Sequence, residues 1–381
     1  MKNTFGNALT VTIFGESHGA AVGAVLDGLT PGTLIDEEYI KAMMDKRRAY
    51  GKISTARQEA DEVEILSGVF EGRATGTPLT LLIRNADTHS SDYSAMKSIA
   101  RPSHADYTAN CRYGGFQDYR GGGHFSGRIT AALVAAGAIV MHELEEKGIY
   151  IGTHIASCHG VNDRSFEGLC PAGQESSAGS LMRDIEFLKA EKFPVLDAAA
   201  AAAMRAEIEK AAGEGDSVGG ILETAIAGLP AGLGEPWFDT LEGMLAHIAF
   251  SVPAVKGIEF GAGFRFAEMK GSEANDAFRY ENGEVVTLTN NNGGINGGIS
   301  NGMPVVFRTA VKPTPSIFKT QQTIDFAERK NTELSLKGRH DPAVIHRAAV
   351  VMDAAAALAA ADMLAMRAQS VSGAGCGLKR L

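Results

Sequence analysis

Residues 9–27 run Leu9-Thr10-Val11-Thr12-Ile13-Phe14-Gly15-Glu16-Ser17-His18-Gly19-Ala20-Ala21-Val22-Gly23-Ala24-Val25-Leu26-Asp27. The first six alternate like a strand with one buried face, and Ala20 to Asp27 predict a second, more buried strand. The segment between them, Gly15 to Gly19, forms a tight turn. A histidine held in such a turn is well placed as a general acid. The alternative is a turn whose polar side chains only satisfy its own backbone.

Glycine is the compositional outlier, because 45 of the 381 residues are glycine, about 12% against roughly 7% in most proteins. These glycines follow no three-residue period, which excludes collagen. Hydrophobic residues at 45% and charged residues at 21% exclude a disordered chain. Clusters of glycine let a backbone approach another group closely. The length predicts one large domain or two fused ones.

Charge and cysteine content restrict the class of protein further. The net charge of −9 and the pI near 5.6 argue against nucleic acid or an acidic membrane as partner. Four cysteines without a CxxC pair, and histidines without metal-ligand spacing, predict a metal-free protein of a reducing cytoplasm. No signal peptide is recognisable, residues 129–141 are too few to span a bilayer, and polar residues interrupt the run 343–366. We therefore expect a soluble, cytoplasmic protein with no membrane partner.

Capping residues and periodicity place further elements. Asp36 is a good N-cap for a helix up to Arg48, and Asp341 followed by Pro342 predicts the start of a long helix. The residues at helical spacing in the first of these are Ile40, Met43, Met44 and Arg47. The other predicted elements are a hairpin of strands over 63–70 and 77–84, a strand over 303–311, and helices over 127–147, 196–212 and 238–250.

An internal similarity occurs at an offset of 200 residues. The matched residues are Ser17, Gly19, Gly28, Leu29 and Gly32 with Ser217, Gly219, Gly228, Leu229 and Gly232. Each segment resembles a strand that is followed by an amphipathic helix. A duplication and a chance match in a glycine-rich chain both remain open on these residues alone.

Several dense polar clusters carry the candidate chemistry, while the GxGxxG and GxxxxGK[ST] phosphate motifs are absent. The segment 101–107 joins a cation, an imidazole and a carboxylate, or else is a solvated loop. In 118–128 three glycines precede an apolar helix, which predicts an anion or cofactor site because free N–H groups and the helix dipole point there. A flexible loop is the alternative.

The remaining clusters allow two interpretations each. Residues 290–302 are too rich in glycine for regular structure, so they lie against a planar ring or form a surface loop. The two prolines of 312–316 stiffen the chain and present Lys312 and the hydroxyl groups in an extended form. In 337–342, Asp341 is a candidate helix cap and also a candidate proton acceptor, and it can have both roles. The basic residues of 45–52 either complement a helix C-terminus or clamp phosphate or carboxylate groups.

Taken together and in this order, the clusters resemble the chorismate synthase family from about Thr4 to Arg367. The motifs that carry the resemblance are Phe14-Gly15-Glu16-Ser17-His18-Gly19, Ile65 to Gly72, Arg101-Pro102-Ser103-His104-Ala105-Asp106-Tyr107-Thr108, Asp118 to Gly123, Gly297-Gly298-Ile299-Ser300 and Gly338-Arg339-His340-Asp341-Pro342. No single motif is decisive, but the series is highly specific.

The resemblance implies an anti 1,4-elimination of phosphate from 5-enolpyruvylshikimate 3-phosphate, giving chorismate in the shikimate pathway. It implies a redox-neutral lyase that requires reduced FMN, with NADPH at most an indirect reductant. The implied fold is α+β, a β-α-β sandwich with an internal duplication, in one domain over 1–381 with halves about 9–150 and 215–366. A homotetramer is implied as the assembly.

The resemblance also implies roles for residues at matching positions. His18, beside Ser17, protonates the departing phosphate, His104 protonates the flavin, and Asp341 relays the proton from flavin N5 through a neighbouring hydroxyl. Ser126 is implied as a further catalytic residue. The implied flavin contacts are His124, Phe125, Ser126, Ala254, Gly297, Lys312, Pro313, Thr314, Pro315, Ser316 and Arg339. The implied contacts to substrate or NADP phosphate are Arg47, Arg48, Lys52 and Arg128.

This sequence departs from the commonest family pattern at individual contacts. His124 and Lys52 stand where arginine is usual, Ile129 replaces a common glutamate, and Pro253 replaces an asparagine. These departures concern flavin and nucleotide contacts, not the reaction. Two other classes remain as alternatives: an oxidoreductase that uses FMN and NADPH, and a non-enzymatic assembly or binding protein.

Overall fold

The structure is a computed structural model that describes residues 2–54, 60–86, 97–166, 169, 177–336 and 341–373. The elements of its first part are β1 (Thr4–Phe5), β2 (Thr10–Gly15), β3 (Ala21–Asp27), α1 (Glu37–Arg47), β4 (Glu64–Ser67), β5 (Val69–Phe70), β6 (Arg73–Ala74), β7 (Leu79–Arg84), α2 (Asp106–Tyr113), the 3₁₀ segments η2 (Arg120–Phe125) and η3 (Gly127–Ile129), and α3 (Thr130–Glu146).

The second part continues with a longer series. Its elements are β8 (Tyr150–Cys158), β9 (Val161–Asn162), α4 (Ser177–Ala190), α5 (Ala198–Gly213), β10 (Gly220–Ala227), η4 (Trp237–Asp239), α6 (Leu241–Ala249), β11 (Val255–Phe260), η5 (Gly263–Glu268), α7 (Gly271–Ala274), β12 (Phe278–Glu281), β13 (Glu284–Thr287), β14 (Ile295–Asn296), β15 (Ile299–Ser300), β16 (Val305–Val311), β17 (Gln321–Asp325), β18 (Lys330–Leu334) and α8 (Ile345–Gly373).

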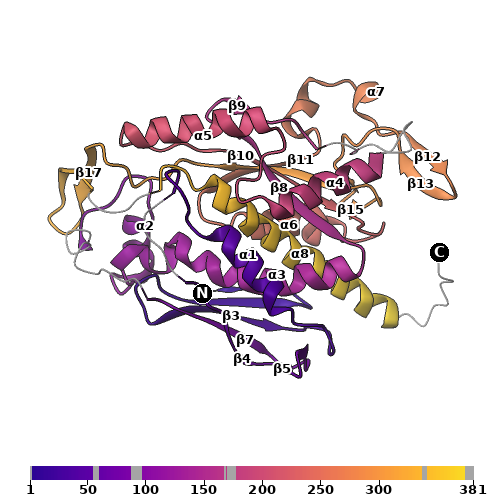
Figure 1. The fold of residues 1–381 in the computed structure, drawn as a ribbon, viewed down its shortest axis with the longest axis horizontal. Coiled ribbons are helices and arrows are strands. Elements are labelled where there is room, and N and C mark those ends of the chain that lie inside the picture. The colour runs from indigo at the N-terminus through magenta and orange to yellow at the C-terminus, as the bar shows by residue number, and fades with distance from the viewer. Residues whose placement is uncertain are drawn as a thin grey trace.

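Two antiparallel sheets enclose the central helices (Figure 1). The first sheet has the strand order β1-β2-β3-β7-β4 and the second has β11-β16-β10-β8-β9. Helix α3 packs on β3 and β7, α8 packs on β8 and β10, and the two helices pack on each other. The predicted α+β class is therefore confirmed, and the apolar faces of both sheets are covered by the same helical layer.

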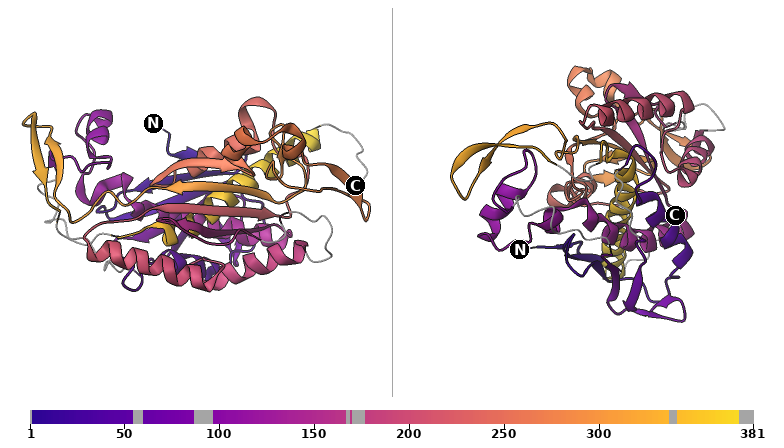
Figure 2. Two further views of the ribbon diagram at one scale, coloured as in Figure 1. Left: turned by 90° about the horizontal axis from the view of Figure 1, so that it is seen from above. Right: turned by 60° about the vertical axis from the view of Figure 1, so that its left-hand side comes forward.

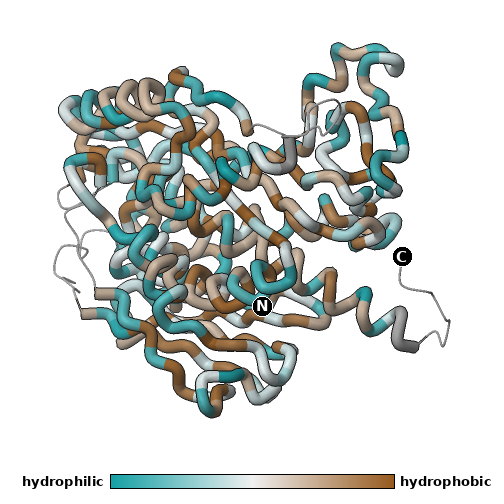
Figure 3. Tube along the Cα trace, turned by 45° about the vertical axis from the view of Figure 1, so that its right-hand side comes forward, coloured by the Kyte–Doolittle hydropathy of each residue, from teal (hydrophilic) through white to brown (hydrophobic). Residues whose placement is uncertain are grey.

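Small residues let α3 and α8 approach closely. A Cβ at Gly137 of α3 would lie only 2.4 Å from the Cβ of Ala354 in α8, so any side chain there would push the helices apart. The right-hand view in Figure 2 shows α8, in yellow, between the sheets. Hydrophobic segments, brown in Figure 3, follow the strands of the first sheet, which face this layer. The alanine-rich helices thus form the centre of the core.

The two strands and the helix predicted for the N-terminal part of the chain are confirmed. Strands β2 and β3 pair in register from Thr10 with Asp27 to Gly15 with Val22, and the Gly15–Gly19 turn joins them. Asp36 caps α1, because its carboxylate accepts from the Tyr39 N–H at 2.9 Å. The buried residues of α1 are Ile40, Met43, Met44 and Arg47, as their spacing predicted.

Two local predictions are wrong. Helix α8 begins at Ile345, so Asp341 and Pro342 precede it and do not form its cap, and the amide of Arg347 bonds to the Val344 carbonyl. The segment 290–302 was expected to lack regular structure, yet it contains the paired strands β14 and β15. In the first case Asp341 accepts from the Arg347 side chain instead of capping the helix. In the second, Gly297 and Gly298 have positive φ angles and form the tight turn of a short hairpin.

Two helices, over residues 127–146 and 345–370, are long and apolar enough to cross a membrane by length and composition. In both, 78% of the apolar window is buried inside the protein. They are the two helices of the central layer, and their apolar surface is covered by the sheets.

The two sheets are built by similar successions of elements. The first succession is β2, β3, α1, β4, β7 and α3, and the second is β8, β10, α6, β11, β16 and α8. The turn glycines Gly28 and Gly228 follow β3 and β10, with φ angles of 93° and 83°. Each packs against the backbone just before the neighbouring strand. The 200-residue sequence similarity therefore coincides with a similarity in strand order.

Candidate active site

Two glycine-containing turns from different parts of the chain are joined by hydrogen bonds. The Ser17 N–H donates to the Gly123 carbonyl at 3.1 Å. The Gly15 carbonyl can only accept, so His124 donates to it from Nδ1, at 2.7 Å. These bonds bring the turn after β2 beside η2, so that the two predicted histidine clusters meet in space.

The glycines of η2 are required because side chains lie directly against them. A Cβ at Gly121 would lie 2.0 Å from His18 Nδ1 and 3.1 Å from Ser17 Oγ, and a Cβ at Gly122 would lie 3.3 Å from His104 Nε2. Both residues also have positive φ angles, 58° and 83°. The backbone of η2 thus packs against both predicted proton donors.

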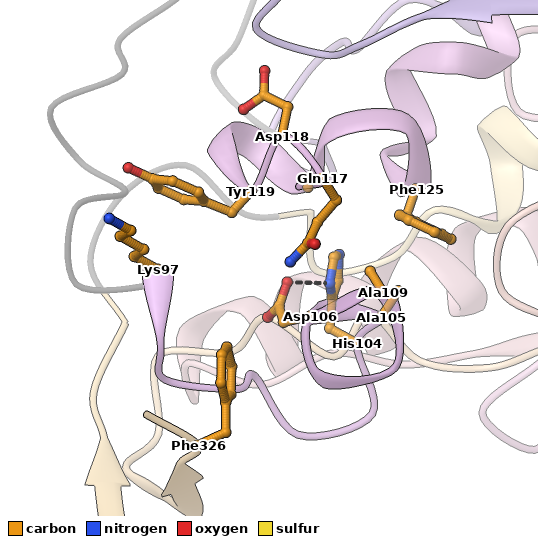
Figure 4. Close-up of a pocket in the computed structure, with 11 residues that line it drawn as sticks. Lys97, His104, Ala105, Asp106, Ala109, Gln117, Asp118, Tyr119, Phe125 and Phe326 are labelled. Carbon is orange, nitrogen blue, oxygen red and sulfur yellow. Dashed lines mark hydrogen bonds and ion pairs between the residues drawn. The ribbon is translucent and has the colours of Figure 1, made fainter. Parts of the chain in front are cut away.

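His104 is held by a charged network. Arg101 donates to both oxygens of Asp106, from Nε at 2.8 Å and from Nη2 at 2.7 Å. His104 Nδ1 lies 2.8 Å from the same carboxylate and 3.0 Å from Arg101 Nη2, and we assign its proton to the shorter contact, since an ionised carboxylate can only accept (Figure 4). Burial alone would raise the pKa of Asp106, but Arg101 and His104 hold it far below its ordinary value. The carboxylate therefore stays ionised and orients the imidazole.

A cavity of about 960 Å³ opens beside these residues. Its basic lining residues, apart from histidine, are Arg47, Arg48, Arg101, Arg128, Lys192, Lys312 and Arg347, and its acidic ones are Asp61 and Asp341. Its apolar wall consists of Phe250, Val252, Pro253, Ala254, Val255, Val344, Ala348 and Val351. The cavity combines an excess of positive charge with an apolar surface, which suits anionic ligands that also carry a ring.

Two buried arginines share one carboxylate on this wall. Arg47 Nη2 donates to Asp61 Oδ2 at 2.6 Å, and Arg128 Nη1 donates to Asp61 Oδ1. Burial lowers the pKa of Arg47 to about 10, although the charge of Asp61 opposes the shift. The pKa of Asp61 is lowered, because the two arginines outweigh its burial. The cluster keeps one positive charge in excess at the cavity.

The segment 312–316 follows β16 and faces the β11 side of the cavity. The Lys312 N–H donates to the Ala254 carbonyl at 2.9 Å, and Lys312 Nζ donates to the Ser103 carbonyl at 2.6 Å. Ala254 and Ser103 have φ angles of 76° and 59°, which are uncommon without glycine. Two strained residues thus lie at one wall, as often at functional sites.

Helix α8 contributes Arg347, which joins two parts of the site. Its Nη1 donates to Asp341 Oδ2 at 2.9 Å, and its Nε donates to the Arg47 carbonyl at 2.7 Å. The position of Asp341 is therefore linked to that of the buried arginine pair.

The match to known proteins covers this whole arrangement. The family model described as "Chorismate synthase" matches residues 9–365. The chain belongs to the chorismate synthase family. It is 47% identical over 363 residues to the chorismate synthase of Methanosarcina mazei, covering 94% of this chain and 95% of that one. The Archaeoglobus fulgidus chorismate synthase is 45% identical, with 96% and 98% covered.

A solved structure agrees with the family. The crystal structure of a chorismate synthase superposes with a TM-score of 0.73 at 27% identity, covering 95% of this chain and 93% of that one.

Most of the site residues predicted from the sequence lie together around the cavity. Those that line the cavity are Arg47, Arg48, His104, His124, Phe125, Ser126, Arg128, Ala254, Lys312, Thr314, Pro315, Ser316 and Asp341. Ser17 and His18 are buried against Gly121, which is itself part of the lining. Arg339 lies outside the described residues. No group of histidine, cysteine, aspartate or glutamate side chains that could hold a metal ion occurs among the described residues.

Three predicted contacts are not among the described residues that line the cavity: Lys52, Pro313 and Gly297. Lys52 and Pro313 are exposed. Gly297 forms the tip between β14 and β15, and its neighbour Gly298 packs on Thr240 at the start of α6. The cavity lies at the other end of α6, about 13 Å away for nine residues of helix.

Three further charged residues line the cavity that were not predicted from the sequence: Asp61, Lys192 and Arg347. Arg101 and Asp106 were seen as part of a cluster but not as the pair that holds His104. Asp61 belongs to a run of charged residues with no motif, and Arg347 belongs to a helix, so nothing local indicated that they meet.

Proposed function

We propose that this protein catalyses the anti 1,4-elimination of phosphate from 5-enolpyruvylshikimate 3-phosphate in the presence of reduced FMN. Family membership makes it a carbon–oxygen lyase that forms chorismate. The observation that supports the detailed reaction is the pair His18 and His104, packed against adjacent glycines beside a basic cavity. An elimination that releases phosphate needs proton donors and cations at the leaving group.

The two histidines have different environments and, in this proposal, different roles. His18 is 8% exposed and lies beside Ser17 under Gly121, so it protonates the phosphate as it departs. In its doubly protonated form, His104 would keep one proton on Nδ1 toward Asp106 and hold the second on Nε2, toward Gly122, where a bound flavin would take it. Arg47 and Arg128 bind the phosphate or carboxylate groups of the substrate.

The cavity suits a flavin together with a substrate. Its volume of about 960 Å³ is near the upper end for small-molecule sites, which leaves room for two ligands. The apolar wall at 252–255 fits a planar ring, while Lys312, Thr314 and Ser316 offer a cation and hydroxyl groups. Reduced FMN, when bound, supplies electron density as phosphate leaves and accepts the C6 hydrogen. His124, Phe125, Ser126, Ala254, Lys312 to Ser316 and Arg339 are the proposed contacts.

Asp341 is the proposed acceptor at the end of the proton relay. Its Oδ2 accepts from Arg347 Nη1, and because an ionised carboxylate has about four lone-pair sites, Asp341 can also accept from a hydroxyl group. Ser126 is the hydroxyl proposed for this step, since both side chains line the cavity.

The assembly and origin of the fold are proposals of the same kind. We propose a cytoplasmic homotetramer in which the β-α-β layers arose by duplication. The similar strand orders support a second half that begins near β8, and not near residue 215 as the sequence led us to expect. Gly297 lies at the far end of α6 from its own cavity, so a contact with flavin needs another copy of the chain. NADPH is proposed only as an indirect reductant, with Lys52 near its phosphate.

Anaerobic incubation with chemically reduced FMN and the enolpyruvyl substrate tests the reaction, with phosphate release as the measurement. We expect phosphate and chorismate in equal amounts. Folded protein that binds flavin but releases no phosphate would overturn the proposal. Aerobic incubation with NADPH and oxidised FMN tests the oxidoreductase alternative. We expect no steady turnover driven by NADPH under these conditions.

A further inference from the structure

We propose that Asp61 is a positioning residue that holds the guanidinium groups of Arg47 and Arg128 in place for the phosphate or carboxylate groups of the substrate. This inference rests on the proposed function, because it assigns the two arginines to substrate binding. Asp61 acts through them and is assigned no contact with substrate.

The geometry gives each arginine its own carboxylate oxygen. Arg47 Nη2 bonds to Oδ2 at 2.6 Å and Arg128 Nη1 bonds to Oδ1. The three side chains are no more than 5% exposed, so water screens them little. Since both oxygens are occupied, Asp61 fixes the separation of the two guanidinium groups.

Neutral groups also orient the arginines. Arg128 Nε donates to Asn85 Oδ1 at 2.9 Å, and Arg47 Nη1 donates to Thr130 Oγ1 at 3.4 Å. Asn85 in turn donates from Nδ2 to the carbonyls of Glu16 and Gly19, both at 2.9 Å. Hydrogen bonds therefore run from Asp61 through Arg128 to the turn that carries His18.

Electrostatics explains why a carboxylate is needed at this position. Arg128 and Arg347 both lower the pKa of Arg47, because like charges face one another on a buried wall. Without Asp61 these guanidinium groups would repel one another and turn toward solvent. Their favoured positions would then no longer match the spacing of a substrate's anionic groups.

Asp61→Asn is the substitution that isolates the charge. Asp61 has a φ angle of 52°, and asparagine tolerates the left-handed region as well as aspartate does. The side chains have the same shape, but the amide places a donor against one guanidinium group. We expect KM for the substrate to rise roughly 10- to 100-fold, with kcat changed less than about three-fold because Asp61 itself bonds to the two arginines and Asn85 still holds the turn that carries His18.

Asp184→Asn is the matched control. Asp184 is also buried and accepts from Arg164 through both oxygens, at 2.6 and 2.9 Å, but on α4 outside the cavity lining. Asp184→Asn, like Asp61→Asn, loses a buried carboxylate that binds arginine, so a general loss of stability should appear in both variants. We expect KM and kcat of Asp184→Asn to equal those of the unmodified protein.

Two further variants keep the test decisive. Asp61→Glu retains the charge on a longer side chain, so it should fold and still raise KM. Asp61→Asn combined with Arg128→Gln should raise KM by less than the product of the two single effects, because Asp61 acts partly through Arg128 and partly through Arg47. An unchanged or lower KM in the folded Asp61 variants, or a loss confined to kcat, would overturn the inference.

Failure of the proposed function would be separately visible. Calorimetric titration of the same variants with 5-enolpyruvylshikimate 3-phosphate, without flavin, measures binding alone. If the unmodified protein binds this compound but releases no phosphate, the reaction is wrong, while the binding constants still test Asp61. If it does not bind the compound at all, both proposals fail.

Discussion

The two glycine-rich stretches of this chain, 121–123 and 293–302, have similar compositions but different surroundings. Gly121 and Gly122 pack against the side chains of His18 and His104 at the cavity. Gly293 and Gly294 pack against the backbone of Gly261, Val306 and Pro304, near the end of β11 and the start of β16. The first stretch lets the backbone lie against the two proposed proton donors, whereas the second lets backbone segments of the second sheet pack together.

An aspartate fixes each stretch. Asp118 accepts from the backbone and side chain of Arg120, which begins η2, and a Cβ at Gly123 would meet the Asp118 carbonyl at 2.0 Å. Asp276 accepts four hydrogen bonds from 289–292, including the N–H groups of Asn291 and Asn292. A glycine-rich sequence thus predicts that the backbone lies close to another group, while only the fold shows which group that is.

The largest expected effect comes from Gly121→Ala. The new methyl group would lie 2.0 Å from His18 Nδ1, so the imidazole must leave its position. Losing a positioned acid lowers kcat by about 10²- to 10⁴-fold, which the rate of phosphate release measures. A folded Gly121→Ala protein with the unmodified rate would show that this stretch has no catalytic role.

Gly293→Ala should instead reduce stability. Its methyl group would lie 2.6 Å from the Gly261 nitrogen and 2.8 Å from the Val306 oxygen, at a φ angle of 61°. We expect a loss of about 2–4 kcal/mol in unfolding free energy from crowding and strain, with kcat of the folded protein unchanged. Denaturant unfolding gives the stability, and a kcat reduced as far as in Gly121→Ala would remove the contrast between the stretches.

Asp276→Asn should give a pH-dependent loss of stability. Burial alone would raise the pKa of Asp276, but hydrogen bonds from Thr289, Asn292 and Asn291 hold it below its ordinary value. A lowered carboxyl pKa stabilises the fold above the unfolded pKa of about 3.9, and this contribution disappears as the pH falls through the folded pKa. We expect the variant to lose about 1–3 kcal/mol at pH 7 and less near pH 3. A loss independent of pH would contradict the role of the charge.

The smallest expected effect is that of Gly213→Ala. Gly213 ends α5 without a positive φ angle, and no atom lies within 4 Å of a Cβ placed there. Alanine restricts the unfolded chain, so a gain of about 0.4–1 kcal/mol in stability is expected, with activity unchanged. Thermal unfolding measures it, and a destabilised Gly213→Ala would mean that glycine is needed outside both stretches.

The sequence predicted those features that depend on interactions between neighbouring residues. The first hairpin of strands, the Asp36 cap and the buried face of α1 follow from alternation, capping and helical spacing, and the structure has them. The meeting of His18 with Gly121 depends on contacts across about 100 residues, so it was expected only through the family resemblance. Asp61 had no motif, because its proposed role arises from two arginines that lie 14 and 67 residues away in the sequence. Asp341 preceded a helix as predicted, but its bond to Arg347 replaces the expected cap.

Parallel anaerobic assays of the unmodified protein, His18→Ala and His104→Ala, each with reduced FMN and 5-enolpyruvylshikimate 3-phosphate, test the central claim most directly. Phosphate release is the measurement, and flavin fluorescence confirms that FMN is bound. We predict one phosphate per chorismate from the unmodified protein and a rate lower by at least about 10²-fold in each variant. Phosphate release by both folded variants at the unmodified rate would contradict the assignment of the cavity as the active site.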